Sequence, residues 1–229
     1  MAKQICRALS VAGVVAMAGL GAGEAMAAGQ GDWLVRAGAT LVAPNDDSSR
    51  VSVPDLGGPV DGTGVTVDND VKPSFTIAYM LTDNLALELI GALPFEHDIG
   101  GKGLGISNIG STKHLPPTLS LQYHFNVTPA IKPYVGVGVN YTIFFEEDVS
   151  GAVRNALGYT KMDIDDSLGW AVQLGSDFEL GGGWLVNADV RYIDIGTEAT
   201  LKGSPTLQNA KVDVDIDPWV FTLAVGKRF

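Results

Sequence analysis

Cysteine, basic charge and long apolar segments are all scarce in this sequence, and each scarcity excludes a class of protein. The 229 residues include a single cysteine, Cys6, so the chain has no disulfide framework and no cysteine-rich metal site. Acidic residues outnumber basic ones by 26 to 15, and the net charge of -11 offers no basic groove, so we predict no nucleic-acid partner. Only three histidines are present, which leaves few candidates for a general base at neutral pH.

The longest apolar run lies near the N-terminus, over residues 8–22. Lys3 and Arg7 precede it, and the small-x-small sequence Ala25-Met26-Ala27 follows it, which is the order of a secretory signal peptide. The run is shorter than the ~20 apolar residues that a membrane-spanning helix needs, and no later segment reaches that length. We therefore predict that residues 1–27 are a cleaved signal peptide and that residues 28–229 form the mature domain.

The sequence is rich in segments where large apolar residues alternate with small or polar ones, with a period of two. Residues 114–145, HLPPTLSLQYHFNVTPAIKPYVGVGVNYTIFF, contain two such segments joined by a short turn. One face of each segment is aliphatic in the middle and aromatic toward the ends, while the other face carries glycine, amides and a histidine. A soluble sandwich would share the period, but this distribution is typical of strands with lipid on one side and a polar lumen on the other.

The same alternation predicts about eight strands, with long and short connections in strict turn. The predicted strands cover residues 32–42, 72–80, 85–92, 115–125, 134–143, 170–177, 184–193 and 218–229. The long connections cover about 44–70, 95–113, 146–163 and 196–211, and the first of them shows no period of its own. An antiparallel sheet with an even number of strands can close on itself, and every backbone group is then hydrogen-bonded within the lipid. We therefore predict an all-β fold: an eight-stranded antiparallel transmembrane up-and-down β-barrel with long extracellular loops and short periplasmic turns.

In each predicted strand every second residue faces the lumen. In the half of the barrel that adjoins the short turns, these inward-facing residues are polar. Its inward positions are Arg36, Glu88, Gln122, His124, Asn140, Gln173, Asp177, Asn187, Asp189, Arg191 and Arg228. Side chains nearly fill the interior of a barrel this narrow, and a buried ion without a partner costs several kcal/mol. Three arginines face three carboxylates, so we predict a balanced charged plug made of Arg36, Glu88, Asp177, Asp189, Arg191 and Arg228.

Toward the long loops the inward-facing residues become apolar. The inward positions there are Val42, Ile90, Ala92, Phe144, Ile193, Ile195, Val214, Ile216, Pro218 and Val220. These residues predict an apolar cup; alternatively, they simply pack against one another and the loops. The aspartates at 213, 215 and 217 alternate outward and lack a calcium-loop pattern, so we interpret them as a solvated rim and predict neither a metal nor a cofactor.

Several segments, in one order along the chain, resemble the OmpW family of small bacterial outer-membrane barrels, which is related to the AlkL-type importers of hydrophobic compounds. They are GDWLVRAGAT (31–40), YMLTDNLALEL (79–89), HLPPTLSLQYHF (114–125), PYVGVGVNYTIFF (133–145), WLVNADVRYIDI (184–195) and DPWVFTLAVGKRF (217–229). The resemblance implies a narrow apolar channel that is closed toward the periplasm and releases its substrates sideways into the membrane. Two positions depart from the family pattern: Lys227 replaces a usual aromatic residue, and Leu168 stands near a channel-lining tryptophan.

Together these features predict a bacterial outer-membrane channel for small hydrophobic molecules. We expect the channel to be lined by Val42, Ile90, Phe144, Ile193 and Val220, with Ile90 at a position where family members carry an apolar channel residue. The prolines Pro73, Pro116 and Pro117 indicate where ladder hydrogen bonds are missing, because proline has no N–H to donate. The alternative is a structural or receptor barrel that contacts phage or host and transports nothing.

We predict no enzymatic activity, because no nucleophile signature accompanies His97, His114 or His124. The expected partners are outer-membrane lipid and lipopolysaccharide, small hydrophobic solutes, and the barrel assembly machinery. That machinery is expected to recognise the alternating C-terminal strand that ends at Phe229.

Overall fold

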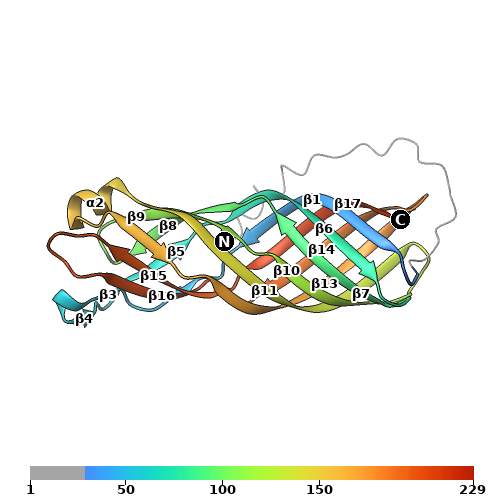
Figure 1. Ribbon diagram of the computed structural model, residues 1–229, viewed down its shortest axis with the longest axis horizontal. Helices are drawn as coiled ribbons and strands as arrows, with labels where there is room; N and C mark the ends of the chain where they lie inside the picture. The colour runs from blue at the N-terminus through green and yellow to red at the C-terminus, as the bar shows by residue number, and fades with distance from the viewer. Residues whose placement is uncertain (1–28) are drawn as a thin grey trace.

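A computed structural model describes residues 29–229, which form a closed barrel whose walls continue beyond it at one end (Figure 1). The predicted signal peptide, residues 1–27, lies outside the described residues. The barrel strands are β1 (Trp33–Ala43), β6 (Asp70–Met80), β7 (Leu85–Ala92), β10 (Thr118–His124), β11 (Ile131–Val149), β13 (Ser167–Gly181), β14 (Trp184–Ile193) and β17 (Trp219–Arg228). Each strand pairs antiparallel with the next along the chain, and β17 pairs with β1 to close the barrel. The predicted eight-stranded up-and-down barrel is therefore confirmed.

The outward faces of these strands form a continuous apolar belt. Large aliphatic side chains such as Val137, Leu174 and Leu223 point outward and are exposed. An aromatic pair, Trp33 and Tyr79, stands at one end of the belt, with ring centroids 4.8 Å apart. Trp170, Tyr192 and Trp219 form a row at the other end, with centroids 5.6 and 5.4 Å apart. Two aromatic girdles around an aliphatic band are typical of a barrel that spans a membrane. No helix among residues 29–229 is long and apolar enough to cross a membrane.

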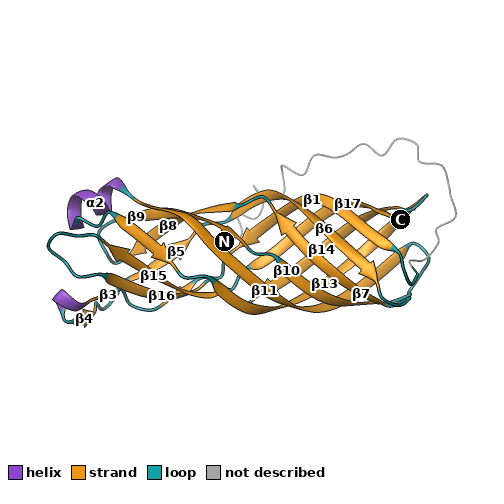
Figure 2. Cartoon of the chain, in the orientation of Figure 1, coloured by secondary structure: helices purple, strands orange, loops and turns teal. Residues whose placement is uncertain are grey.

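The two ends of the barrel differ, and we name them the turn end and the loop end. The turn end carries the C-terminus and the short connections, such as the tight turn between β13 and β14 (Figure 1). The loop end carries the four long connections, which project as strands well beyond the barrel (Figure 2). The girdle of Trp170, Tyr192 and Trp219 lies toward this end, and we call it the outer girdle. In bacterial barrels the long loops are extracellular, so the loop end is expected to face outside.

The long connections, which were expected to be loops, contain regular strands, and this includes the first one, which was expected to have no period. They contain β2 (Asp47–Ser48), β3 (Ser52–Val53), η2 (Pro54–Leu56), β4 (Gly58–Pro59), β5 (Gly64–Val67), β8 (Phe95–Lys102), β9 (Asn108–Leu115), α2 (Gly151–Leu157), β12 (Lys161–Ile164), β15 (Gly196–Lys202) and β16 (Ala210–Asp215). β5, β8 and β9 extend the sheet beside the outer half of β11, and β12, β15, β16, β3 and β4 form a second sheet. These strands satisfy their backbone groups by pairing with connections far away in sequence, which the period of a single segment does not reveal.

Candidate functional site

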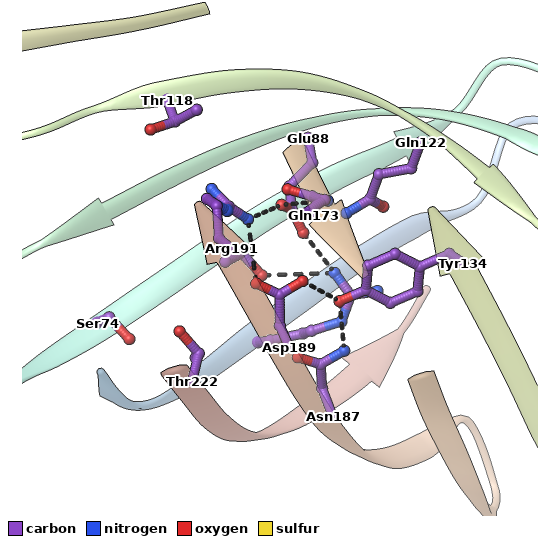
Figure 3. Close-up of polar contacts among 12 residues, drawn as sticks. Ser74, Glu88, Thr118, Gln122, Tyr134, Gln173, Asn187, Asp189, Arg191 and Thr222 are labelled. Atoms are coloured by element: carbon purple, nitrogen blue, oxygen red, sulfur yellow. Dashed lines mark hydrogen bonds and ion pairs between the residues drawn. The ribbon is translucent and has the colours of Figure 1, made fainter. Parts of the chain in front are cut away.

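The inner half of the lumen is filled by an ion-paired network centred on Arg36. This side chain is 1% exposed, and its Nε and Nη2 donate to the two carboxylate oxygens of Asp177 at 3.0 and 2.6 Å. Its Nη1 donates to Glu88 at 3.1 Å, and the other oxygen of Glu88 accepts from Arg191 at 2.8 Å. Arg36 and Arg191 thus share Glu88 as a bridge between β1, β7 and β14. Figure 3 shows Glu88 beside Arg191. Such bidentate, charge-assisted contacts hold the side chains in one geometry.

Tyr134 joins the remaining carboxylate to this network. Its hydroxyl donates to Asp189 at 2.9 Å and accepts from Asn187 at 2.9 Å, and Asn187 also donates to Asp177 at 2.8 Å (Figure 3). The Tyr134 ring crosses the lumen against Gly175, where a β-carbon would collide with the phenol. A glycine is therefore required on β13 for the tyrosine to reach across the barrel.

Arg228 does not belong to this network, and the predicted balance of three charges against three is wrong. Its guanidinium lies at the turn end, 3.2 Å from Glu179 and 3.7 Å from Asp32. The parity of Arg228 is correct, but its position near the end of β17 leaves it beyond the reach of the central carboxylates. Two arginines thus face three carboxylates, and hydrogen bonds from Tyr134 and Asn187 compensate the excess. From here on the plug means Arg36, Glu88, Asp177, Asp189 and Arg191, with Tyr134 and Asn187.

The outer half of the lumen is apolar, as the parity of the strands predicted. A cavity of about 810 Å³, counting its opening to solvent, lies among the loop-end strands, and we call it the cup. Val214 and Ile216 line it while Asp213 and Asp215 are exposed on the opposite face of β16. The barrel wall therefore continues above the outer girdle with apolar side chains inside and acidic ones outside.

A smaller space of about 330 Å³, again counting its opening to solvent, lies between the cup and the plug, and we call it the middle cavity. Four of the five predicted channel residues line it, namely Val42, Ile90, Ile193 and Val220. The fifth, Phe144, lines the cup instead. Phe95 stands between the two cavities, because it lines the middle cavity and packs on His114 of the cup with ring centroids 5.6 Å apart. Arg191 of the plug forms the floor.

The barrel wall beside the middle cavity has an interrupted ladder. The pairing of β7 with β10 ends at Ile90 and Thr118, and pairing across the same seam resumes only at Phe95 and His114 of β8 and β9. Residues 91–94 therefore face residues 115–117 in a segment that we call the window. Pro116 and Pro117 lie in the window and supply no N–H, and the Pro117 carbonyl accepts instead from Tyr141 on β11 at 3.2 Å.

Among the three predicted prolines, the window contains two. Pro116 lines the middle cavity next to Gly91 and Ala92, so this cavity reaches the wall at the interrupted ladder. Pro73 lies elsewhere, within the regular β1–β6 ladder opposite Ala39. All three prolines lack an N–H, but the strand pairing is interrupted at Pro116 and Pro117, whereas Pro73 lies within a paired strand.

Leu168 lies outside the lumen, contrary to the expectation from the family pattern. It is 72% exposed and pairs with the outward-facing Tyr141. The departure at Lys227 also lies on the outer surface, where its ammonium stands 5.2 Å from the Trp184 ring centroid and 5.5 Å from that of Phe229. A lysine stem and its charge can occupy an aromatic girdle in this way because the charged end reaches the interface. Neither departure changes the channel.

Sequence reasoning missed much of the cup wall, including His97, Ile109 and Met162. These residues belong to connections that were expected to be irregular. A signal was present in the segment Phe95-Glu96-His97-Asp98-Ile99, which alternates between buried and exposed positions. This segment of five residues was too short to distinguish a strand from a loop.

The comparisons with known proteins agree with this architecture. A sequence model of the OmpW family matches residues 29–229. "Outer membrane protein W" of Vibrio cholerae is 38% identical over 96% of this chain and 99% of its own length. The crystal structure of the outer membrane protein OprG from Pseudomonas aeruginosa superposes with a TM-score of 0.83 at 40% identity, covering 88% of this chain and 97% of OprG.

Two further relatives carry different names. "Outer membrane protein AlkL" of Ectopseudomonas oleovorans is 32% identical over 87% of this chain and 83% of its own length. "Dibenzothiophene metabolism operon protein PahQ" of Pseudomonas aeruginosa is 30% identical over 86% of this chain and 88% of its own length.

Proposed function

The chain belongs to the OmpW family and is an outer-membrane β-barrel, and from that premise we propose that it passes small hydrophobic molecules from outside into the outer membrane. The solute enters the cup at the loop end, descends to the middle cavity and leaves sideways through the window. It does not cross the plug. The relative named for a dibenzothiophene metabolism operon supports substrates of this class, since dibenzothiophene is an apolar aromatic compound.

Two apolar cavities stacked above a charged plug carry this proposal. A hydrophobic solute gains by moving from water into the cup and middle cavity, at about 25 cal/mol for each Å² of apolar surface buried. Moving further down would replace apolar contacts with the Arg36 and Arg191 ion pairs, and separating a buried pair costs several kcal/mol. The plug therefore closes the route to the turn end.

The window offers the cheaper exit. Elsewhere a solute crossing the barrel wall would have to break ladder hydrogen bonds, but Pro116 and Pro117 leave few to break there. Tyr141, bonded to Pro117, belongs to the outward-facing surface at the level of the outer girdle. A solute leaving through the window would thus arrive in the outer part of the lipid layer.

Catalysis is not part of this proposal. His97 and His114 pack against each other and against aromatic rings, and His124 contacts Gln122 at 3.0 Å. Among the described residues, no serine, threonine, cysteine or tyrosine side chain forms a hydrogen bond with any of these imidazoles. The lipid belt implies contact with outer-membrane lipid and lipopolysaccharide. We also propose that the assembly machinery recognises the strand ending at the exposed Phe229.

Uptake of a labelled long-chain alkane by cells with and without the protein tests the proposal. Ile90→Asp places a charge in the middle cavity and should abolish the protein-dependent uptake, whereas the matched change Ile90→Leu should preserve it at equal folded abundance. Ala92→Trp, which fills the window from inside, should block uptake and still allow the cup to bind. Uptake that is independent of the protein would favour a structural or receptor barrel. Normal uptake by Ile90→Asp would place the route elsewhere.

A further inference from the structure

Two buried histidines stand in the mostly apolar wall of the cup, which also contains Thr112, Thr197 and the exposed Lys211. His97 of β8 and His114 of β9 are 2% and 3% exposed, and their rings stack with centroids 4.8 Å apart and planes 16° apart. Phe95 and Phe144 pack on His114 with centroids 5.6 and 5.7 Å away. Two imidazoles in such a place are costly unless their nitrogens find hydrogen-bond partners.

The hydrogen bonds of this pair are incomplete. His97 Nδ1 contacts the carbonyl oxygen of Asp68, and since a carbonyl can only accept, Nδ1 carries the proton. His97 Nε2 is then an acceptor, and it has no partner among the described residues. His114 Nδ1 is also unpartnered there, and its ring is free to adopt either tautomer. The pair therefore presents one fixed acceptor and one imidazole that can donate.

Charge is not available at this site. Burial lowers the pKa of His97 below its ordinary value, and burial together with the neighbouring His97 lowers the pKa of His114 to about 3. Both rings are consequently neutral at physiological pH. The one charged residue in the cup wall, Lys211, donates to Glu198 at 2.6 Å and is exposed. A carboxylate or an ammonium group in the cup would remain without a counter-ion, which disfavours ionised ligands.

We propose that His97 and His114 form a polar subsite for the hydroxyl group of an otherwise apolar molecule, such as a long-chain alcohol. The hydroxyl donates to His97 Nε2 and accepts from the N–H of His114, and the hydrocarbon chain lies along the apolar wall of the cup. A hydroxyl suits both rings at once because it is donor and acceptor together. This subsite refines the substrate class of the proposed channel and rests on that function.

The two methionines of residues 29–229 provide a direct readout. Met162 lines the cup, whereas Met80 is buried at the turn end with Leu34 and Leu185, below the plug. The full barrel is labelled with 13C at the methionine methyl groups in lipid nanodiscs and titrated with dodecane, 1-dodecanol and the methyl ether of 1-dodecanol. The ether keeps the oxygen but loses the donor. Shifts at Met162 report the cup, and Met80 serves as the internal reference.

The comparison is the alcohol-to-ether affinity ratio in the wild type divided by the same ratio in the double variant His97→Phe/His114→Phe. Partitioning into lipid cancels in this quotient, and phenylalanine keeps aromatic rings in the stack. We expect the quotient to be roughly 3 to 10, as for one net hydrogen bond. Lys113→Gln is the matched control, because this residue lies beside His114 on β9 but pairs with Glu146 on the outside, and it should leave the ratio unchanged.

The 15N shifts of the imidazole rings in the wild type give a second measurement that does not depend on a variant folding. The alcohol should move the His97 Nε2 resonance, and the ether should move it much less. A quotient near 1, or identical ring shifts with both ligands, would overturn the subsite. If dodecane itself leaves Met162 unchanged, the proposed channel fails; if dodecane binds but the quotient is near 1, only the subsite fails.

Discussion

The plug and the cup are both lined by the inward faces of alternating strands, but the plug lies on the barrel strands and the cup lies mainly on the strands of the long connections. In the plug, hydrogen bonds and ion pairs join side chains from β1, β7, β11, β13 and β14 into a single network. In the cup, apolar side chains line a space that they do not fill. The difference teaches that parity alone decides which residues face inward, and that residue type decides whether the interior is closed or open.

The largest expected effect comes from breaking the plug at its centre. Arg36→Met removes the partner of both Glu88 and Asp177 and leaves two buried carboxylates without it. We expect the free energy of unfolding to fall by roughly 3 to 5 kcal/mol, measured by urea titration of the lipid-refolded barrel. Arg228→Met, at the turn end, should cost less, because it deprives one buried carboxylate, Glu179, of its partner rather than two, and Asp32 is partly exposed. Equal losses for the two variants would contradict the separation of Arg228 from the plug.

The outer surface should respond next most strongly, because it tests parity directly. Val137 is 61% exposed and lies in the aliphatic band of β11. Val137→Arg should lower the free energy of unfolding in lipid by roughly 2 to 4 kcal/mol if it lies near the midplane, while Val137→Leu should have little effect. The same urea titration measures both changes. A small loss for the arginine variant would mean that this band does not face lipid.

Acidification should loosen the cup, which is a smaller and local effect. Burial holds the pKa of His97 and His114 below the ordinary value of 6.5, although Asp68 and Asp70 oppose this shift at His97 and Lys72 adds to it. In the unfolded hairpin both rings take up a proton near pH 6.5, whereas in the folded one they resist. The stability of β8 and β9 is therefore complete above about pH 6.5 and falls as the pH drops toward the folded values.

Methyl spectra recorded from pH 7 to pH 4 measure this effect. Met162 should shift or broaden while Met80 stays constant, and His97→Phe/His114→Phe should remove the pH dependence. A pH response that is equal at both methionines would indicate that the cup and the plug do not differ in this respect.

The sequence was sufficient for the barrel and for the facing of its strands, because lipid and lumen impose a strict period of two. Ile90 and Ile193 were placed inward correctly for that reason. It was insufficient for the cup, because β8 and β9 pair with each other and are held in place by β5 and β11, which lie outside their own connection. It also could not assign the partner of Arg228, since parity gives the direction of a side chain but not its height along the barrel.

Leu168 provides the smallest expected effect and the sharpest check on the boundary of the cup. Its side chain points away from the lumen at the level of Tyr141, so Leu168→Trp would add an aromatic ring to the outer girdle. Surface changes of this kind usually alter the free energy of unfolding by no more than about 0.5 kcal/mol. The ring should also leave the Met162 titration with dodecane unchanged, because nothing is added inside the cup. A tryptophan that altered the affinity of the cup would have to reach the lumen, and the strand register of β11 with β13 would then need to shift by one residue.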